Sequence, residues 1–87
     1  MAEDQNPFSV TLRAFVLPDE SMEGPQLGET FPVHLSGVVT AGEFTRRYFL
    51  QREKQIGMVT VNGKIAPPTT VLREGDRIDV YPLIEGG

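Results

Sequence analysis

Three stretches of the chain alternate apolar and polar residues with a period of two, at residues 8–17, 29–35 and 77–83. Side chains two positions apart share one face of a strand, so this alternation predicts three strands that each have one apolar face. Pro32 lies inside the second stretch and cannot donate a hydrogen bond to a neighbouring strand, which predicts that this strand lies at a sheet edge. A short apolar run at residues 58–61 predicts a fourth strand, with Val59 and Val61 facing inward.

One helix is predicted between the strands at residues 29–35 and 58–61. Thr40 and Glu43 match a capping box, in which each side chain bonds the backbone amide of the other residue. Val39 and Phe44 occupy the two positions of a hydrophobic staple around the same start. The apolar stripe of the helix consists of Ala41, Phe44, Thr45 and Tyr48, with Phe49 beside it. Gly57 is the expected end of the helix.

The links between these elements carry residues that are typical of turns. Residues 18–28 contain two prolines and two glycines and predict a loop. Asn62-Gly63 and residues 73–76 predict two tight turns, and residues 69–72 are expected to form a short turn of helix. The order of elements predicts an α+β fold. Its helix lies across one face of a mixed sheet, and the first and last strands lie parallel at the sheet centre.

The elements together predict one small domain. We expect residues 1–7 to be a disordered lead-in, residues 8–83 to be the folded domain and residues 84–87 to be a flexible tail. The tail ends in Gly86 and Gly87, which lack a Cβ atom and can therefore thread a narrow tunnel. If extended, its four residues reach about 13 Å. Such a tail suits a carboxylate that is delivered into another protein's active site, and a frayed chain end is the alternative.

Charge and composition exclude several classes of function. The formal net charge is −4, which argues against a nucleic-acid-binding protein because such proteins need a basic surface. The chain has no cysteine, so it has no disulfide, no thiolate metal site and no cysteine nucleophile. It shows neither an apolar run long enough to span a bilayer nor a signal-peptide pattern. We therefore expect a cytoplasmic protein that binds no membrane.

The sequence shows no catalytic set of side chains. His34 is the one histidine, and its outward position on an edge strand predicts simple exposure. Glu74 and Asp76 belong to the chemistry of a turn. No nucleophile with a matching base is visible, so we expect a protein that is not itself an enzyme.

Four features in order resemble the ubiquitin-like β-grasp sulfur carriers of prokaryotes, which include the small subunit of molybdopterin synthase and the sulfur carrier of thiamine biosynthesis. The features are Thr40-x-x-Glu43, Val61-Asn62-Gly63, Leu72-Arg73-Glu74-Gly75-Asp76-Arg77-Ile78 and Gly86-Gly87. The resemblance covers residues 8–87 and implies a β-grasp fold, with a mixed sheet of four to five strands and one main helix across one face. Residues 81–87 are most similar to the ending of the molybdopterin synthase small subunits. Residues 18–28 and Glu85 depart from the family pattern.

This resemblance implies that sulfur is carried on the Gly87 carboxylate. A ubiquitin-activating-type adenylating enzyme would activate it with ATP and Mg²⁺, because this chain has no phosphate-binding loop of its own. Sulfur from a persulfide would then form a thiocarboxylate, which an acceptor synthase subunit uses. Gly86 would be a steric requirement for threading the tail. No cofactor is expected to bind to the chain itself.

Strand alternation also predicts a surface for docking to such partners. Phe15, Tyr81 and Leu83 fall on the face of the sheet away from the helix, where grouped apolar side chains indicate a binding patch. Arg13 and Arg77 lie on the same face and would add charged contacts. The alternative is a set of scattered surface apolar residues.

Several functions remain open at this point. Sulfur delivery in molybdenum or tungsten cofactor synthesis is the preferred interpretation. Within the carrier class, the alternatives are thiamine, cysteine or tRNA thiolation. Outside that class, the alternative is a ubiquitin-like interaction module that is never thiolated.

Overall fold

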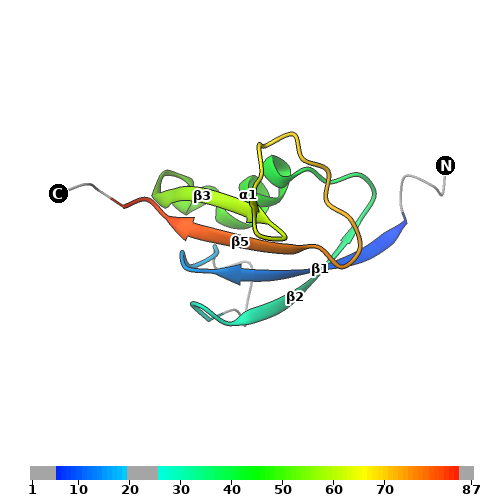
Figure 1. Cartoon of the computed structure of the whole chain (residues 1–87), viewed down its shortest axis with the longest axis horizontal. Coiled ribbons are helices and arrows are strands. Elements are labelled where there is room, and N and C mark those ends of the chain that lie inside the picture. The colour runs from blue at the N-terminus through cyan, green and yellow to red at the C-terminus, as the bar shows by residue number, and fades with distance from the viewer. Residues whose placement is uncertain (1–5, 20–25, 85–87) are drawn as a thin grey trace.

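The computed structural model describes residues 6–19 and 26–84. Its elements are β1 (Pro7–Ala14), β2 (Thr30–Ser36), α1 (Ala41–Phe49), the 3-10 helix η2 (Leu50–Gln55), β3 (Ile56–Val61), β4 (Lys64–Ile65) and β5 (Arg77–Pro82). The strands form one sheet in the order β2-β1-β5-β3-β4, and the helices lie across one face of it (Figure 1). The predicted α+β architecture is confirmed, with five strands in the sheet.

The two ends of the domain pair at the centre of the sheet, as predicted. β1 and β5 run parallel, with Leu12 opposite Ile78 and Ala14 opposite Val80. β3 flanks β5 on its other side in the antiparallel direction. Pro32 lies in β2, which is an edge strand, so its missing N–H faces no further strand of the sheet. The final strand is therefore held on both sides.

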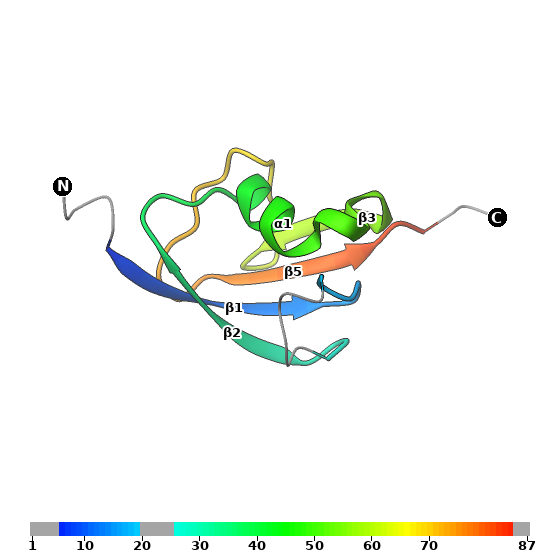
Figure 2. The same ribbon diagram turned by 180° about the vertical axis from the view of Figure 1, so that it is seen from behind.

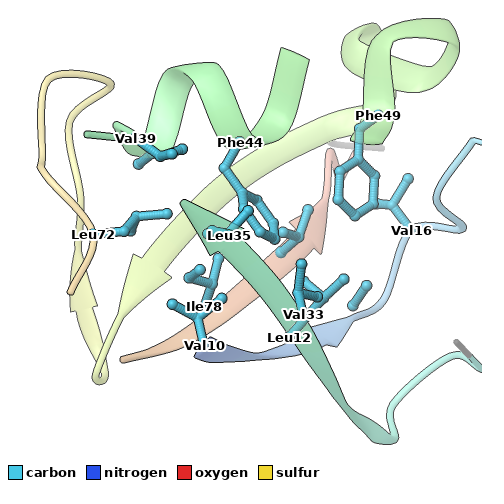
Figure 3. Close-up of a cluster of buried hydrophobic side chains, with 13 residues drawn as sticks. Val10, Leu12, Val16, Val33, Leu35, Val39, Phe44, Phe49, Leu72 and Ile78 are labelled. Carbon is cyan, nitrogen blue, oxygen red and sulfur yellow. The ribbon is translucent and has the colours of Figure 1, made fainter. Parts of the chain in front are cut away.

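The core lies between α1 and the sheet (Figure 3). The capping box forms as predicted, since the Thr40 hydroxyl accepts from the Glu43 amide at 3.1 Å and the Glu43 carboxylate accepts from the Thr40 amide at 3.3 Å. Phe44 and Phe49 are fully buried against the strands, whose inward rows supply most of the remaining core. The buried apolar residues of the strands are Val10, Leu12, Ala14, Val33, Leu35, Ile78 and Val80.

The helix does not end at Gly57, and that prediction was wrong. α1 ends at Phe49 and passes into η2, and Gly57 lies inside β3. A glycine cap is not needed, because distant groups satisfy the backbone here: the Asp19 amide donates to the Tyr48 carbonyl at 2.7 Å and the Asp19 carboxylate accepts from the Gln51 amide at 3.1 Å. Tertiary hydrogen bonds replace the local signal that a helix end normally carries.

The segment before β5 is also different from the prediction, because residues 69–72 form no helical turn. A tight turn closes with the Thr70 amide donating to the Pro67 carbonyl at 3.0 Å, and Val71 then bridges Thr40. The Leu72 amide donates to the Val39 carbonyl at 2.9 Å. Backbone pairing with the start of α1 therefore takes the donors and acceptors that a local helix would have used.

The predicted tight turns are confirmed. Asn62 and Gly63 have φ angles of 54° and 85° in the β3–β4 connection, the left-handed conformation that a two-residue hairpin requires. In residues 73–76, the Asp76 amide donates to the Arg73 carbonyl at 3.1 Å. β1 ends at Ala14, three residues before the end of its alternating stretch, although the Phe15 amide still bonds the Val80 carbonyl at 2.8 Å.

Candidate functional site

The face of the sheet opposite α1, here called the outer face, carries an aromatic pair. Phe15, just after β1, and Tyr81, in β5, stack with their ring centroids 5.3 Å apart and their planes 11° from parallel. Met58 is the cross-strand partner of Tyr81 in β3 and is exposed, so it extends the apolar surface. The structure thus brings together Phe15 and Tyr81 as the alternation predicted.

Two arginines share one buried carboxylate beside this aromatic pair. Asp79 is 1% exposed and accepts from Arg13 Nε at 3.2 Å and Arg13 Nη2 at 3.1 Å. Arg77 Nε donates to the same carboxylate at 3.3 Å. Arg13 also lies over the Phe15 ring, 5.6 Å from its centroid. The predicted arginines therefore stand together, next to the aromatic pair.

These contacts stabilise the protonated form of Arg13. The hydrogen bond to Asp79 raises the pKa of the Arg13 guanidinium above its ordinary value, and the Asp79 charge and Tyr81 act in the same direction. An arginine is protonated at physiological pH in any case, so Arg13 is a cation there.

Asp79 was not among the site residues predicted from the sequence, although the strand register carries a signal for its pairing with Arg13. Arg13 lies opposite Asp79 in the parallel register of β1 and β5. Both residues carry the outward phase of their strands, so the register alone would have predicted this ion pair.

The tail leaves the sheet from the end of β5. After Pro82, Leu83 is 56% exposed and Ile84 is 85% exposed. Figure 2 shows this end of β5 at one extreme of the long axis, beside η2 and the start of β3. Gly86 and Gly87, the predicted threading and thiolation residues, lie outside the described residues. The structure thus shows the root of the tail and the surface next to it.

The described residues show no metal-binding cluster. No group of three His, Asp or Glu side chains among residues 6–19 and 26–84 could hold a metal ion. His34 Nδ1 lies 3.0 Å from the Ser9 hydroxyl at the surface of the edge strand. Within the same ranges, no helix is long and apolar enough to cross a membrane.

Comparison with protein families identifies the chain, since the profile of the ThiS family matches residues 20–87, most of its length. The chain belongs to the ThiS family. ThiS-family proteins are ubiquitin-like sulfur carriers, are not enzymes, and are activated by adenylating enzymes of the ubiquitin-activating type. This family assignment confirms the resemblance that the four sequence features, from Thr40-x-x-Glu43 to the terminal Gly86-Gly87, indicated.

The fold of this ThiS-family protein is similar to that of a solved archaeal protein. The crystal structure of SAMP1 from Haloferax volcanii aligns with a TM-score of 0.59 and 20% sequence identity, covering 91% of this chain and 99% of that one. At that identity the similarity concerns the fold alone, which is β-grasp. No curated protein matches the sequence.

Proposed function

We propose that the Gly87 carboxylate of this ThiS-family carrier is adenylated by a partner enzyme and then converted to a thiocarboxylate for sulfur transfer. The observation that carries the proposal is the position of β5. This strand is paired with β1 on one side and β3 on the other, and its end leads through exposed Leu83 and Ile84 to the last three residues. A reactive chain end is thereby attached to the central strand of the sheet.

The proposed chemistry needs no catalytic group from this chain. The Gly87 carboxylate attacks the α-phosphorus of ATP in the partner's site, and pyrophosphate leaves. The terminal sulfur of a persulfide then attacks the acyl carbon and expels AMP. A thiol cleaves the resulting acyl disulfide and releases the thiocarboxylate. Gly86, without a Cβ, allows the tail to pass a narrow tunnel to reach these reagents.

The outer face is the proposed docking surface for the adenylating enzyme and for the acceptor subunit. It presents stacked Phe15 and Tyr81 with Leu83 at the start of the tail, and the Arg13 and Arg77 cations beside them. Aromatic and arginine side chains are the residue types that most often dominate binding at protein interfaces. Because this surface adjoins the tail root, a partner bound to it would also receive the tail.

We propose a molybdopterin or tungstopterin precursor as the sulfur acceptor. The support is residues 81–87, whose aromatic-Pro-x-x-x-Gly-Gly pattern is similar to the ending of molybdopterin synthase small subunits. Transfer to that precursor would take place in a complex with a synthase large subunit, and this chain would be the small subunit that delivers sulfur.

Intact-mass measurement tests the carrier function. The protein is incubated with its adenylating enzyme, ATP, Mg²⁺ and a persulfide donor, and we expect a mass gain equal to the exchange of one oxygen for one sulfur. Deleting Gly87 should abolish the gain, whereas His34→Ala, an exposed change on the far edge strand, should leave it intact. Absence of any gain in the wild-type protein, together with full pathway activity of the Gly87 deletion, would instead support an interaction module that is never thiolated.

A second stage of the experiment tests the acceptor. The thiocarboxylated protein is mixed with a molybdopterin synthase large subunit and the pterin precursor, or with a thiazole synthase and its substrate. Sulfur transfer in the first mixture alone supports the proposed pathway, and transfer in the second alone contradicts it.

A further inference from the structure

The start of β3 lies against the backbone of the tail root more closely than any side chain would allow. The register of β3 against β5 shifts between Ile56 and Met58, which places Gly57 at an irregularity of the pairing. A Cβ atom added to Gly57 would come within 2.7 Å of the Pro82 carbonyl oxygen, 2.8 Å of Leu83 Cα and 3.1 Å of Leu83 N. All three are backbone atoms, so no side-chain rotation could relieve the contact.

Close approach, and not backbone conformation, accounts for a glycine at this position. Gly57 is not among the glycines that have a positive φ angle within residues 6–19 and 26–84, which are Gly28, Gly37, Gly63 and Gly75. An alanine could therefore adopt its dihedral angles, and the neighbouring Pro82 and Leu83 are what exclude a larger residue. Glycine in a strand often marks a site where another backbone approaches closely.

A hydrogen bond fixes the same point of the tail root. The Leu83 amide donates to the Gln55 carbonyl at 2.7 Å, although the strand pairing itself ends one residue earlier at Pro82. Gln55 is the last residue of η2, and the Ile56 amide that follows it bonds the Glu53 carbonyl. The acceptor for Leu83 is thus held by a closed turn.

Together these contacts mark the boundary between the part of the chain that is held by the fold and the part that is exposed. Leu83 is bonded to η2 and packed on Gly57, whereas the next residue, Ile84, is 85% exposed. Four residues, 84–87, follow this boundary in the sequence. If they are extended, the terminal carboxylate lies within about 13 Å of Leu83.

We propose that Gly57 and the Gln55 carbonyl form a tail-root clamp, which positions the last four residues for adenylation. The clamp rests on the proposed function of the Gly87 carboxylate. It sets where the tail begins and in which direction it leaves the end of β5, so that docking and delivery of the carboxylate occur in one binding event. Gly57 is accordingly a positioning residue that acts through Leu83 and touches no substrate.

Amide hydrogen exchange tests the clamp without any partner protein. In Gly57→Ala we expect the Leu83 amide to lose its protection, while the amides of the β1–β5 pairing keep theirs. The matched control is Gly63→Ala in the turn that follows β3, where a Cβ meets nothing within 4 Å but the φ angle of +85° strains an alanine. Gly63→Ala should leave Leu83 protected. Unchanged Leu83 protection in Gly57→Ala would overturn the clamp.

Adenylation kinetics test whether the clamp positions the tail. With the carrier as the varied substrate in ATP–pyrophosphate exchange, we expect Gly57→Ala to lower kcat by about tenfold to a hundredfold, because small misplacement of a reacting group has effects of that size. KM should stay within about twofold, since Phe15, Tyr81, Arg13 and Arg77 on the outer face are unchanged. Gly63→Ala controls for lost stability. A kcat equal to wild type, or an equal fall in the Gly63→Ala control, would contradict the proposal.

A second pair of variants tests the tail-root clamp if Gly57→Ala does not fold. Leu83→Pro and Leu83→Ala both remove the leucine side chain, but only proline removes the amide that bonds Gln55. We expect a kcat for Leu83→Pro that is about tenfold below that of Leu83→Ala. Equal values would refute the clamp. If wild-type protein shows no exchange activity, the proposed function fails, and the hydrogen-exchange result still stands by itself.

Discussion

The Asn62 side-chain amide donates a 2.8 Å hydrogen bond to the Asp76 carboxylate, although the two residues are 14 positions apart in the sequence. The Asn62 side-chain oxygen Oδ1 accepts from the Arg77 amide at 2.9 Å, and the second Asp76 carboxylate oxygen accepts from the Arg73 amide at 2.8 Å. Two motifs that indicated the family thus form one network. The network closes the β3–β4 turn onto the start of β5, the strand that leads to the tail.

Replacing Asn62 should weaken the fold without touching the outer face. Asn62→Ala removes both side-chain bonds and places an alanine at a φ angle of 54°. We expect the free energy of unfolding to fall by about 2 kcal/mol, because the variant loses two side-chain hydrogen bonds and strains the backbone at a positive φ angle. Urea denaturation measures the change.

Asn62→Gly separates the two contributions to that loss. Glycine tolerates the positive φ angle but makes no side-chain hydrogen bond, so this variant should recover only part of the lost stability. Full recovery in Asn62→Gly would show that the Asn62–Asp76 network contributes nothing and that only the backbone conformation matters.

The two arginines on the outer face should be strongly coupled through Asp79. Either Arg13 or Arg77 alone still compensates the buried carboxylate, so Arg13→Met and Arg77→Met should each lower the urea midpoint only slightly. The double variant should lose more stability than the sum of the two, because it leaves a charge buried without a partner. A double-mutant cycle measures this coupling, and strictly additive losses would mean that Asp79 is compensated by some other group.

The stacked aromatic pair should govern how tightly the carrier binds its adenylating enzyme. Phe15→Ala and Tyr81→Ala are each expected to raise the carrier's KM by about tenfold, as truncation of an aromatic anchor at an interface commonly does. Val38→Ala is the matched control, since Val38 is 67% exposed in the loop between β2 and α1, away from the outer face. If all three variants have the same KM, the partner docks on a different surface.

Much of the fold follows from local patterns that the tertiary structure did not override. Alternation predicted the strands because one face of each packs on the core, and the capping box at Thr40 predicted the helix start because its hydrogen bonds are local. The predictions that failed concern Gly57 and residues 69–72. In both places the local sequence was ambiguous, and pairing with a distant segment decided the backbone path.

The candidate site divides in the same manner. The alternation placed Arg13, Phe15, Arg77 and Tyr81 on one face. The apolar row of each strand faces the core, so the alternate residues of both strands point to the opposite face. The alternation showed neither the burial of Asp79 between the two arginines nor the contact of Gly57 with Leu83. Both depend on the pairing register of strands that are distant in the chain.

By itself, the sequence determined the class of fold, the helix start, the tight turns and the family, because those depend on residue types at short spacing. Only the tertiary structure decided where the helix ends, how Asp79 holds Arg13 and Arg77, and where the tail separates from the sheet. The physical reason is the range of the interactions. A cap or an Asn-Gly turn is satisfied within a few residues, whereas a backbone contact such as Gly57 on Leu83 exists only once β3 and β5 have paired.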